Sequence, residues 1–271
     1  MTLVSTNWLN ENLNKVKIID ASWHLVKNRN AIEEYNKEHI ENAIFFDLDK
    51  NSNQKKDLPH GHFLPSASDH EKNISKMGIL NTDRIIIYCY SDLISSCRAW
   101  FQFLYFGHSP KLVSVLNGGM KKWKLEGRKV TNLKTKIIPS KYKARKNKNM
   151  IKEKFQIYKN IEKKEFTVLD ARSKNRFLGL EPEPRPGIKS GSIEGSKSMP
   201  LSNIIDLKDN TFLDTKKLKN IFNSSKISSN KIVMSCGSSV SAASLALAYS
   251  LINDDYIPKI YIGSWTEFGK K

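Results

Sequence analysis

The sequence predicts an α/β protein made of two tandem copies of one small domain, each a doubly wound parallel sheet flanked by helices. Two observations lead to this fold class. Short β-branched runs alternate with longer helical patterns, which is typical of parallel strands covered on both faces. The same order of runs also occurs twice within the 271 residues, and this indicates a duplication.

The duplication is visible when the two halves are aligned on their first apolar strand. The run "VKIIDASWHL" contains Asp20, and "EFTVLDARSKNRF" repeats it with Asp170. Further along, "DRIIIYCYSD" matches "NKIVMSCGSS", which places Cys89 on Cys236. The intervals agree, because Asp20 and Cys89 are 69 residues apart and Asp170 and Cys236 are 66 residues apart.

Each copy continues with the same succession of elements. In the first copy, the strands "RIIIYC" and "LVSVLN" enclose the helical run "SSCRAWFQFLYFG". In the second copy, "KIVMSC" and "PKIYIG" enclose "SSVSAASLALAYSLI", and Gly118 aligns with Gly263. We therefore predict domains at residues 1–134 and 153–271, joined by a lysine-rich linker at residues 135–152.

Composition excludes several classes of protein. Hydrophobic residues make up 39% of the chain, which is typical of globular proteins. The chain starts without a signal-peptide pattern and has no apolar run near the roughly 18 residues of a membrane span. Three cysteines are too few for a disulfide framework or a zinc site with paired ligands. We expect a cytoplasmic protein with reduced thiols, no metal and no contact with membranes.

The formal net charge of +18 raises the question of a polyanion partner. The excess is mostly lysine and is densest between Arg128 and Phe155. That segment has neither the interleaved aromatic residues of single-strand binders nor a helix-turn-helix signature. A solvated lysine-rich face is the favoured interpretation, and nucleic-acid binding is unlikely on these patterns.

The strand "KIVMSC" ends in Cys236, where doubly wound folds place their ligands. Gly237 and three serines follow, so backbone amides can turn inward, and the amino end of a helix expected over Val240–Leu251 adds a positive dipole. These features favour a reactive thiolate over an inert buried thiol. A cysteine phosphatase is disfavoured, because such enzymes require arginine at the position of Ala242.

Motifs along nearly the whole chain now point to a family. The stretches "HIENAIFFDLD", "LNGGMKKW", "NRFLGLEPEPR", "SCGSSVSA" and "GSWTEFG" resemble the two-domain rhodanese-family sulfurtransferases, and the 3-mercaptopyruvate enzymes more than the thiosulfate enzymes. The resemblance implies that Cys236 takes sulfur from a donor, holds it as a persulfide and passes it to a thiol, thioredoxin or cyanide. It implies no organic cofactor.

The resemblance also implies a donor site. Arg176 and Arg185 correspond to the arginines that hold the carboxylate and keto group of mercaptopyruvate, and a guanidinium fork suits a planar carboxylate. Thiosulfate enzymes carry basic residues just after the cysteine, whereas this loop is neutral. The expected substrate-binding residues are Arg176, Arg185, Gly237, Ser239, Val240 and Ser241.

A proton relay is implied in the same way. Its members correspond to Ser238, to His62 in "HFLP" and to Asp49 in "FFDLD", and they would protonate the pyruvate enolate as sulfur leaves. His60 competes with His62, because "PHGHFLP" is two residues longer than the usual pattern; the spacing to "LP" favours His62.

Some positions depart from the family pattern CGSGVT. Ser239 stands in place of its second glycine and Ser241 in place of its threonine, so strain is expected if position 239 needs a positive φ. Cys89 lacks a glycine-led loop, and we expect no second active site there. Two alternatives stay open: a thiosulfate sulfurtransferase, and a non-catalytic binding module on the same scaffold.

Overall fold

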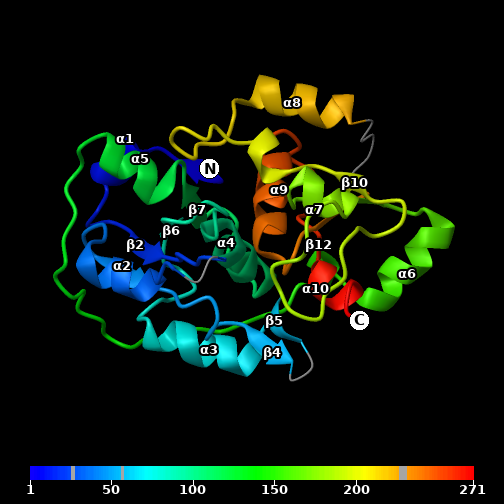
Figure 1. The fold of residues 1–271 in the computed structure, drawn as a ribbon. Helices are drawn as coiled ribbons and strands as arrows, with labels where there is room; N and C mark the ends of the chain where they lie inside the picture. The colour runs from blue at the N-terminus through cyan, green and yellow to red at the C-terminus, as the bar shows by residue number, and fades with distance from the viewer. Residues whose placement is uncertain (26–27, 56–57, 226–230) are drawn as a thin grey trace. The chain divides into compact units, whose positions relative to one another are not determined.

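Two separate parallel sheets organise the chain, and each belongs to its own unit (Figure 1). The structure, a computed structural model, describes residues 1–25, 28–55, 58–225 and 231–271. The first unit comprises residues 1–52, 65–147 and 206–212, and the second comprises residues 53–64, 148–205 and 213–271. Each unit therefore contains a short segment from the other half of the chain. The domain boundaries expected at residues 134 and 152 stay a prediction.

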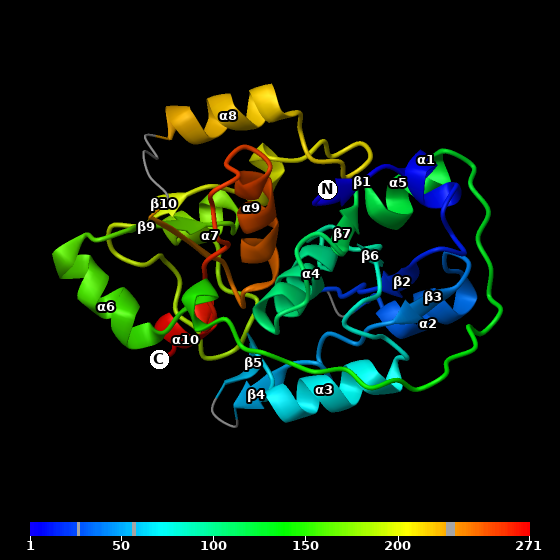
Figure 2. The same cartoon turned by 180° about the vertical axis from the view of Figure 1, so that it is seen from behind.

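The sheet of the first unit has the strand order β1-β7-β6-β2-β3. Its central strands are buried along their whole length and rich in isoleucine and valine, as strands covered on both faces require. Helices α1 and α5 lie side by side in both views (Figures 1 and 2). The elements are β1 (Leu3–Val4), α1 (Thr6–Asn10), β2 (Lys17–Asp20), α2 (Ala31–Lys37), β3 (Ala43–Phe45), α3 (Ala67–Lys76), β6 (Ile85–Tyr88), α4 (Ser96–Tyr105), β7 (Val113–Leu116) and α5 (Gly119–Leu125).

The sheet of the second unit has the order β10-β9-β11-β12-β8, and all its paired strands are parallel. Two short 3-10 helices, η1 and η2, interrupt its connections. The elements are η1 (Lys148–Met150), β8 (Ile151–Lys152), α6 (Lys154–Lys163), β9 (Thr167–Asp170), α7 (Lys174–Leu178), β10 (Lys197–Ser198), η2 (Leu201–Asn203), α8 (Thr215–Ser224), β11 (Ile232–Ser235), α9 (Val240–Ser250), β12 (Ile260–Tyr261) and α10 (Ser264–Phe268).

The register of the two sheets confirms the internal repeat. Asp20 lies opposite Tyr88 in the first sheet, and Asp170 lies opposite Ser235 in the second. The residues that follow are Cys89 and Cys236, so the two cysteines occupy the same topological place. The predicted α/β fold with two parallel sheets flanked by helices is confirmed.

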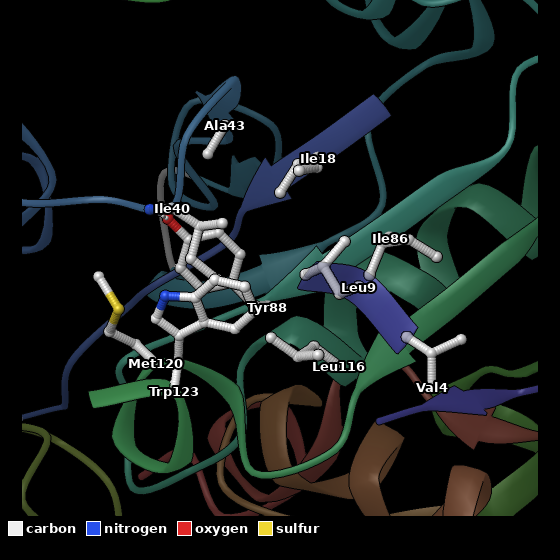
Figure 3. Packing of buried hydrophobic residues seen from close by; sticks show 10 residues of the cluster. All are labelled: Val4, Leu9, Ile18, Ile40, Ala43, Ile86, Tyr88, Leu116, Met120 and Trp123. Atoms are coloured by element: carbon white, nitrogen blue, oxygen red, sulfur yellow. Dashed lines mark hydrogen bonds between the residues drawn. The ribbon is translucent and has the colours of Figure 1, made fainter. Parts of the chain in front are cut away.

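The core of the first unit forms around Trp123 and Tyr88 (Figure 3). Trp123 is 1% exposed, and its indole nitrogen donates to the carbonyl of Lys129 at 2.9 Å. The hydroxyl of Tyr88 accepts from the backbone nitrogen of Ile40 at 3.2 Å. Because the polar atoms of both rings have hydrogen-bond partners, no desolvation penalty reduces the stabilisation that comes from burying their apolar area.

In the second unit, α9 is buried on every side from Val240 to Tyr249. Its alanines and serines are small enough for neighbouring elements to approach closely, as expected of a helix that is apolar all round. At the edge of this unit, the rings of Tyr158 and Phe268 stack 4.8 Å apart. They join α6 to α10, which lie side by side in both views (Figures 1 and 2).

An antiparallel hairpin from the first half of the chain belongs to the second unit. It consists of β4 (Asn53–Lys55) and β5 (Leu58–Phe63). Leu58 and Phe63 are buried in one cluster with Ile262, which follows β12. This apolar contact ties the hairpin to the second sheet. Among the described helices, none has the length and apolar composition needed to cross a bilayer.

Candidate active site

Cys236 directly follows β11, at the carboxyl end of the second sheet, where α/β folds bind their ligands. Residues 236–239, here named the cysteine loop, connect β11 to α9. The Cys236 side chain is 2% exposed, and Ser239 and Ser238 are also buried. The loop therefore forms a small interior site and not a surface turn.

The carbonyl groups of the cysteine loop are turned towards α10. The oxygen of Cys236 accepts from the backbone nitrogen of Trp265 at 2.9 Å. The oxygen of Gly237 accepts from the backbone nitrogen of Thr266 at 2.8 Å and from its hydroxyl at 2.6 Å. These bonds from α10 fix the backbone of Cys236 and Gly237 in place.

A serine outside the loop holds its two ends together. The Ser264 hydroxyl accepts from the backbone nitrogens of Cys236 at 3.3 Å and Ser239 at 3.1 Å. It donates in turn to the carbonyl of Tyr261 at 2.9 Å. Sequence reasoning missed this residue and Thr266. The signal that could have found them is the short "GSWTEF" helix, which follows the strand next to β11.

Ser239 has φ of +66°, in the left-handed region that favours glycine. The strain expected from this departure is therefore present, at a cost of about 1–2 kcal/mol for a residue with a side chain. A hydrogen bond offsets part of this strain, because the Ser239 hydroxyl donates to the carbonyl of His62 in β5 at 3.3 Å. Val240 and Ser241 begin α9 immediately afterwards, and both are buried.

Two predicted arginines lie beside the loop. A Cβ atom at Gly237 would lie 2.8 Å from Nη1 of Arg185 and 3.3 Å from Nη2 of Arg176, so only glycine leaves both guanidinium groups in place. Nη2 of Arg185 also donates to the hydroxyl of Ser238 at 2.8 Å. Burial lowers the pKa of Arg185, and the neighbouring Cys236 acts in the opposite direction.

His62 reaches the same hydroxyl from β5. Its Nδ1 lies 2.9 Å from Oγ of Ser238, and the histidine is 3% exposed. Because Arg185 can only donate, the hydroxyl hydrogen of Ser238 is free to point at Nδ1 of His62. The structure thus brings together Ser238 and His62, which lie 176 residues apart in the chain. The side chain of His60 lies outside the described residues.

Asp49, the third expected relay member, is an exposed residue of the first unit. Its Oδ1 accepts from the indole nitrogen of Trp23 at 3.1 Å. Its place in a relay with Ser238 and His62 stays a prediction.

A buried ion-pair network supports the arginines. Arg172 forms a bidentate pair with Asp170 and donates from Nη1 to Glu183 at 2.7 Å. Its guanidinium also lies over the ring of Trp265, 4.7 Å from the ring centroid. Sequence reasoning did not single out this network. Within the described residues, no group of histidine, cysteine and acidic side chains could hold a metal ion.

Comparison with known proteins agrees with this geometry. The family model of the rhodanese-like domain matches residues 5–126 and again residues 155–271. Thiosulfate/3-mercaptopyruvate sulfurtransferase 1 of Arabidopsis thaliana is 36% identical over 98% of this chain and 75% of its own length. Thiosulfate sulfurtransferase of Bos taurus is 34% identical and 3-mercaptopyruvate sulfurtransferase of Homo sapiens is 33% identical, each over 98% of this chain and 91% of the relative.

Solved structures show the same fold. The crystal structure of SseA from Escherichia coli, a 3-mercaptopyruvate sulfotransferase, superimposes with a TM-score of 0.85 at 27% identity, covering 98% of this chain and 99% of that one. A sulfur transferase subunit of yeast mitochondrial complex I gives a TM-score of 0.86 at 29% identity, covering 99% and 96%. The two sheets, the repeat and these matches show that the chain belongs to the rhodanese family of sulfurtransferases, with two rhodanese-like domains.

Proposed function

We propose that this chain is a 3-mercaptopyruvate sulfurtransferase that carries sulfur as a persulfide on Cys236. The observation that carries the proposal is the position of Arg176 and Arg185, whose guanidinium groups converge on Gly237 beside the nucleophile. The loop itself contributes no charged side chain. Two planar forks over a neutral loop suit the carboxylate and keto oxygens of a small 2-keto acid.

The chemistry follows from this placement. The Cys236 thiolate attacks the thiol sulfur of mercaptopyruvate, and a sulfur–sulfur bond forms while the carbon–sulfur bond breaks. The electron pair of the broken bond stays on carbon and gives the enolate of pyruvate. A proton delivered to that carbon completes pyruvate, and the sulfur stays on Cys236 as a persulfide. Gly237, Ser239, Val240 and Ser241 are proposed to surround the donor, and the Ser264 hydroxyl fixes the Ser239 backbone in this arrangement.

The proton comes from the Ser238 hydroxyl in this proposal, with His62 resupplying it. Arg185 and His62 hold Oγ of Ser238 from two sides. When Nδ1 of His62 carries a proton and donates it to Oγ, the hydroxyl hydrogen of Ser238 is available to the donor. Asp49 is proposed as the group that completes the relay. In the second half-reaction, a nucleophilic acceptor, either a thiolate or cyanide, attacks the outer sulfur and releases the Cys236 thiolate. A low-molecular-weight thiol, thioredoxin or cyanide can take this role.

Thiosulfate is the second candidate donor. It is favoured by one observation, since relatives of similar identity are thiosulfate sulfurtransferases, among them the protein of Bos taurus. The neutral cysteine loop weighs against it, because a dianion gains more from added positive charge than a monoanion does.

The cytoplasmic location expected from the sequence stays a prediction.

Steady-state kinetics with the two donors test the proposal. We expect kcat/KM to be higher for mercaptopyruvate, and Arg185→Gln to lower it about a hundredfold, as expected on losing charge-assisted hydrogen bonds. The control is Lys189→Gln, which removes a positive charge from an exposed side chain of the same segment. A clear preference for thiosulfate would sink the proposal. If neither donor adds one sulfur atom to the intact mass, the chain is a binding module.

A further inference from the structure

Five charged side chains form a buried cluster beside the cysteine loop. Three are arginines and two are carboxylates, and all lie in the second unit. Asp170, Arg172 and Glu183 have side chains that are 1% exposed, and Arg176 is 16% exposed. Arg185 is 7% exposed. Charges removed from water to this degree interact strongly, so their sum matters for any ion that enters.

Glu183 lies at the centre of the cluster, and its carboxylate forms ion pairs with two arginines. Its Oε1 accepts from Nη1 of Arg172 at 2.7 Å and from Nε of Arg176 at 3.2 Å. Its Oε2 accepts from Nη2 of Arg176 at 2.6 Å. Glu183 therefore binds Arg176 with a two-pronged ion pair. Glu183 thus occupies the Nε–Nη2 edge of the Arg176 guanidinium and balances its charge before any donor arrives.

Arg185 differs from the other two arginines. Within the described part of the chain it has no carboxylate in ion-pair contact, and its hydrogen bond goes to the neutral hydroxyl of Ser238. Arg172 is paired with Asp170, and Arg176 with Glu183. Without counting Cys236, three arginines and two carboxylates leave one net positive charge, which resides on Arg185. A Cys236 thiolate adds one negative charge, which disfavours a dianion more than a monoanion.

A site with one net positive charge discriminates between ions by their charge. Attraction to the site grows in proportion to the ligand's charge, whereas the cost of removing an ion from water grows with the square of that charge. For a monoanion, the attraction to this cluster therefore offsets the cost of leaving water. For a dianion, that cost exceeds the attraction. Adding one positive charge favours the dianion more than the monoanion.

We propose that Glu183 is a positioning residue that restricts the donor site to singly charged donors by neutralising Arg176. The inference rests on the proposed use of Arg176 and Arg185 as the anion site of the donor. Glu183 acts on the donor only through Arg176, and the net charge of the cluster sets the charge of the donor that binds best.

Binding of two inert anions to Cys236→Ser protein tests the rule without chemistry. Methanesulfonate and sulfate have nearly the same shape, with one and two negative charges. We expect Glu183→Gln in this background to raise the ratio of sulfate affinity to methanesulfonate affinity at least about tenfold, because it raises the net charge of the cluster by one. Isothermal titration gives both affinities at fixed ionic strength.

Two matched variants separate charge from structure. Glu183→Asp keeps the charge while shortening the side chain, and we expect the ratio to change less than about threefold. Glu181→Gln removes a carboxylate two residues away that contacts Ser173 and Asn175, and it should leave the ratio unchanged. An equal shift in Glu183→Asp and Glu183→Gln, or no shift in Glu183→Gln, overturns the inference.

The result is informative even if Glu183→Gln does not fold. In that case the protein with only Cys236→Ser decides: sulfate binding more than about tenfold tighter than methanesulfonate contradicts the rule, and comparable affinities support it. Kinetics with Cys236 intact add a second readout, since Glu183→Gln should raise kcat/KM for thiosulfate relative to mercaptopyruvate. A wild-type preference for thiosulfate would refute the proposed donor without deciding the role of Glu183, which the anion ratios measure independently.

Discussion

The loops that follow β6 and β11 occupy the same topological place in the two units, yet the side chains around them differ. The carbonyl of Cys89 accepts from the nitrogen of Met120 at 3.0 Å, just as that of Cys236 accepts from Trp265 at 2.9 Å. The backbone scaffold is therefore shared. What differs is the set of side chains attached to it.

Three differences separate the loops. The Cys89 thiol lies 3.4 Å from the Ser96 hydroxyl, and burial raises its pKa, which disfavours the thiolate. Gly119 stands where the second copy has Ser264, so the first loop lacks the counterpart of the Ser264 hydroxyl. Six residues lie between Cys89 and α4, against three between Cys236 and α9. Duplication preserved the frame, and the site depends on a few substitutions in one copy.

The aspartates that end β2 and β9 show the same divergence. Asp170 is paired with Arg172, whereas Asp20 has Ser22 at the equivalent position, with Oγ of Ser22 2.5 Å from its Oδ1. Burial raises the pKa of Asp20 to about 6, and the hydrogen bonds from Ser22 counteract this only in part. One copy pairs its buried carboxylate with an arginine, and the other holds it with the backbone nitrogen and hydroxyl of Ser22.

The largest expected effect is on sulfur loading itself. Cys236→Ser should abolish the gain of one sulfur atom on incubation with mercaptopyruvate, because the nucleophile is lost. Cys89→Ser should load as the wild type does. Intact mass spectrometry of the two variants, side by side, checks this contrast. Loading that survives in Cys236→Ser and disappears in Cys89→Ser would reverse the assignment of the two copies.

The two aspartates should respond in opposite directions at neutral pH. Folding raises the pKa of Asp20, so its contribution to stability is complete below about pH 4 and is lost as the pH rises through about 6. Ionised Asp20 then costs up to about 3 kcal/mol. At pH 7 we expect Asp20→Asn to raise the free energy of unfolding, with no gain at pH 4.

Asp170→Asn is the matched change in the second copy. It leaves the buried Arg172 without its bidentate partner, and we expect a loss of about 3–5 kcal/mol at pH 7. Urea denaturation of both variants at pH 4 and pH 7 measures the two effects. Parallel pH profiles for Asp20→Asn and the wild type would show that Asp20 is not the titrating group.

The smallest effect concerns the residue that closes the loop. Ser264→Gly introduces the residue of the first copy, and glycine accepts the local φ of +49° without strain. The loop loses two hydrogen bonds, and we expect the single-turnover rate of sulfur loading to fall about tenfold. Equal loading rates for Ser264→Gly and the wild type would mean that Ser264 does not position the cysteine loop.

The reciprocal exchange is the control for that experiment. A Cβ atom at Gly119 would lie 2.4 Å from the carbonyl oxygen of Cys89, so Gly119→Ser should lower the melting temperature. Its effect on sulfur loading should be small, because Gly119 belongs to the other unit. Thermal unfolding and the loading assay together separate a structural change from a change at the site.

Sequence reasoning predicted the parts of the site that are local. Cys236 could be placed because a β-branched strand, a glycine and a helix start lie within a few residues of it. The strain at Ser239 was expected for the same reason, since φ depends on the loop in which the residue sits. Arg176 and Arg185 followed from the family resemblance of their segment.

The contacts that complete the site depend on residues far apart in the chain. Ser264 meets Ser239 across 25 residues, and His62 meets Ser238 across 176 residues. The contact of His62 with Ser238 was expected only from the family resemblance, and the contact of Ser264 with Ser239 was not expected at all, because these hydrogen bonds form only after β5 and β12 have packed. The role of Glu183 was invisible for a related reason: a glutamate in a polar segment reads as a surface residue until burial pairs it with arginines.

By itself, the sequence determined the duplication, the order of strands and helices, and the loop that carries the candidate nucleophile. These properties arise from periodicity and local turn chemistry, which act over a few residues. Only the tertiary structure decided that Ser264 closes the cysteine loop and how three arginines share two carboxylates. Those outcomes depend on distance and burial, and electrostatic interactions become strong only when folding removes the charges from water.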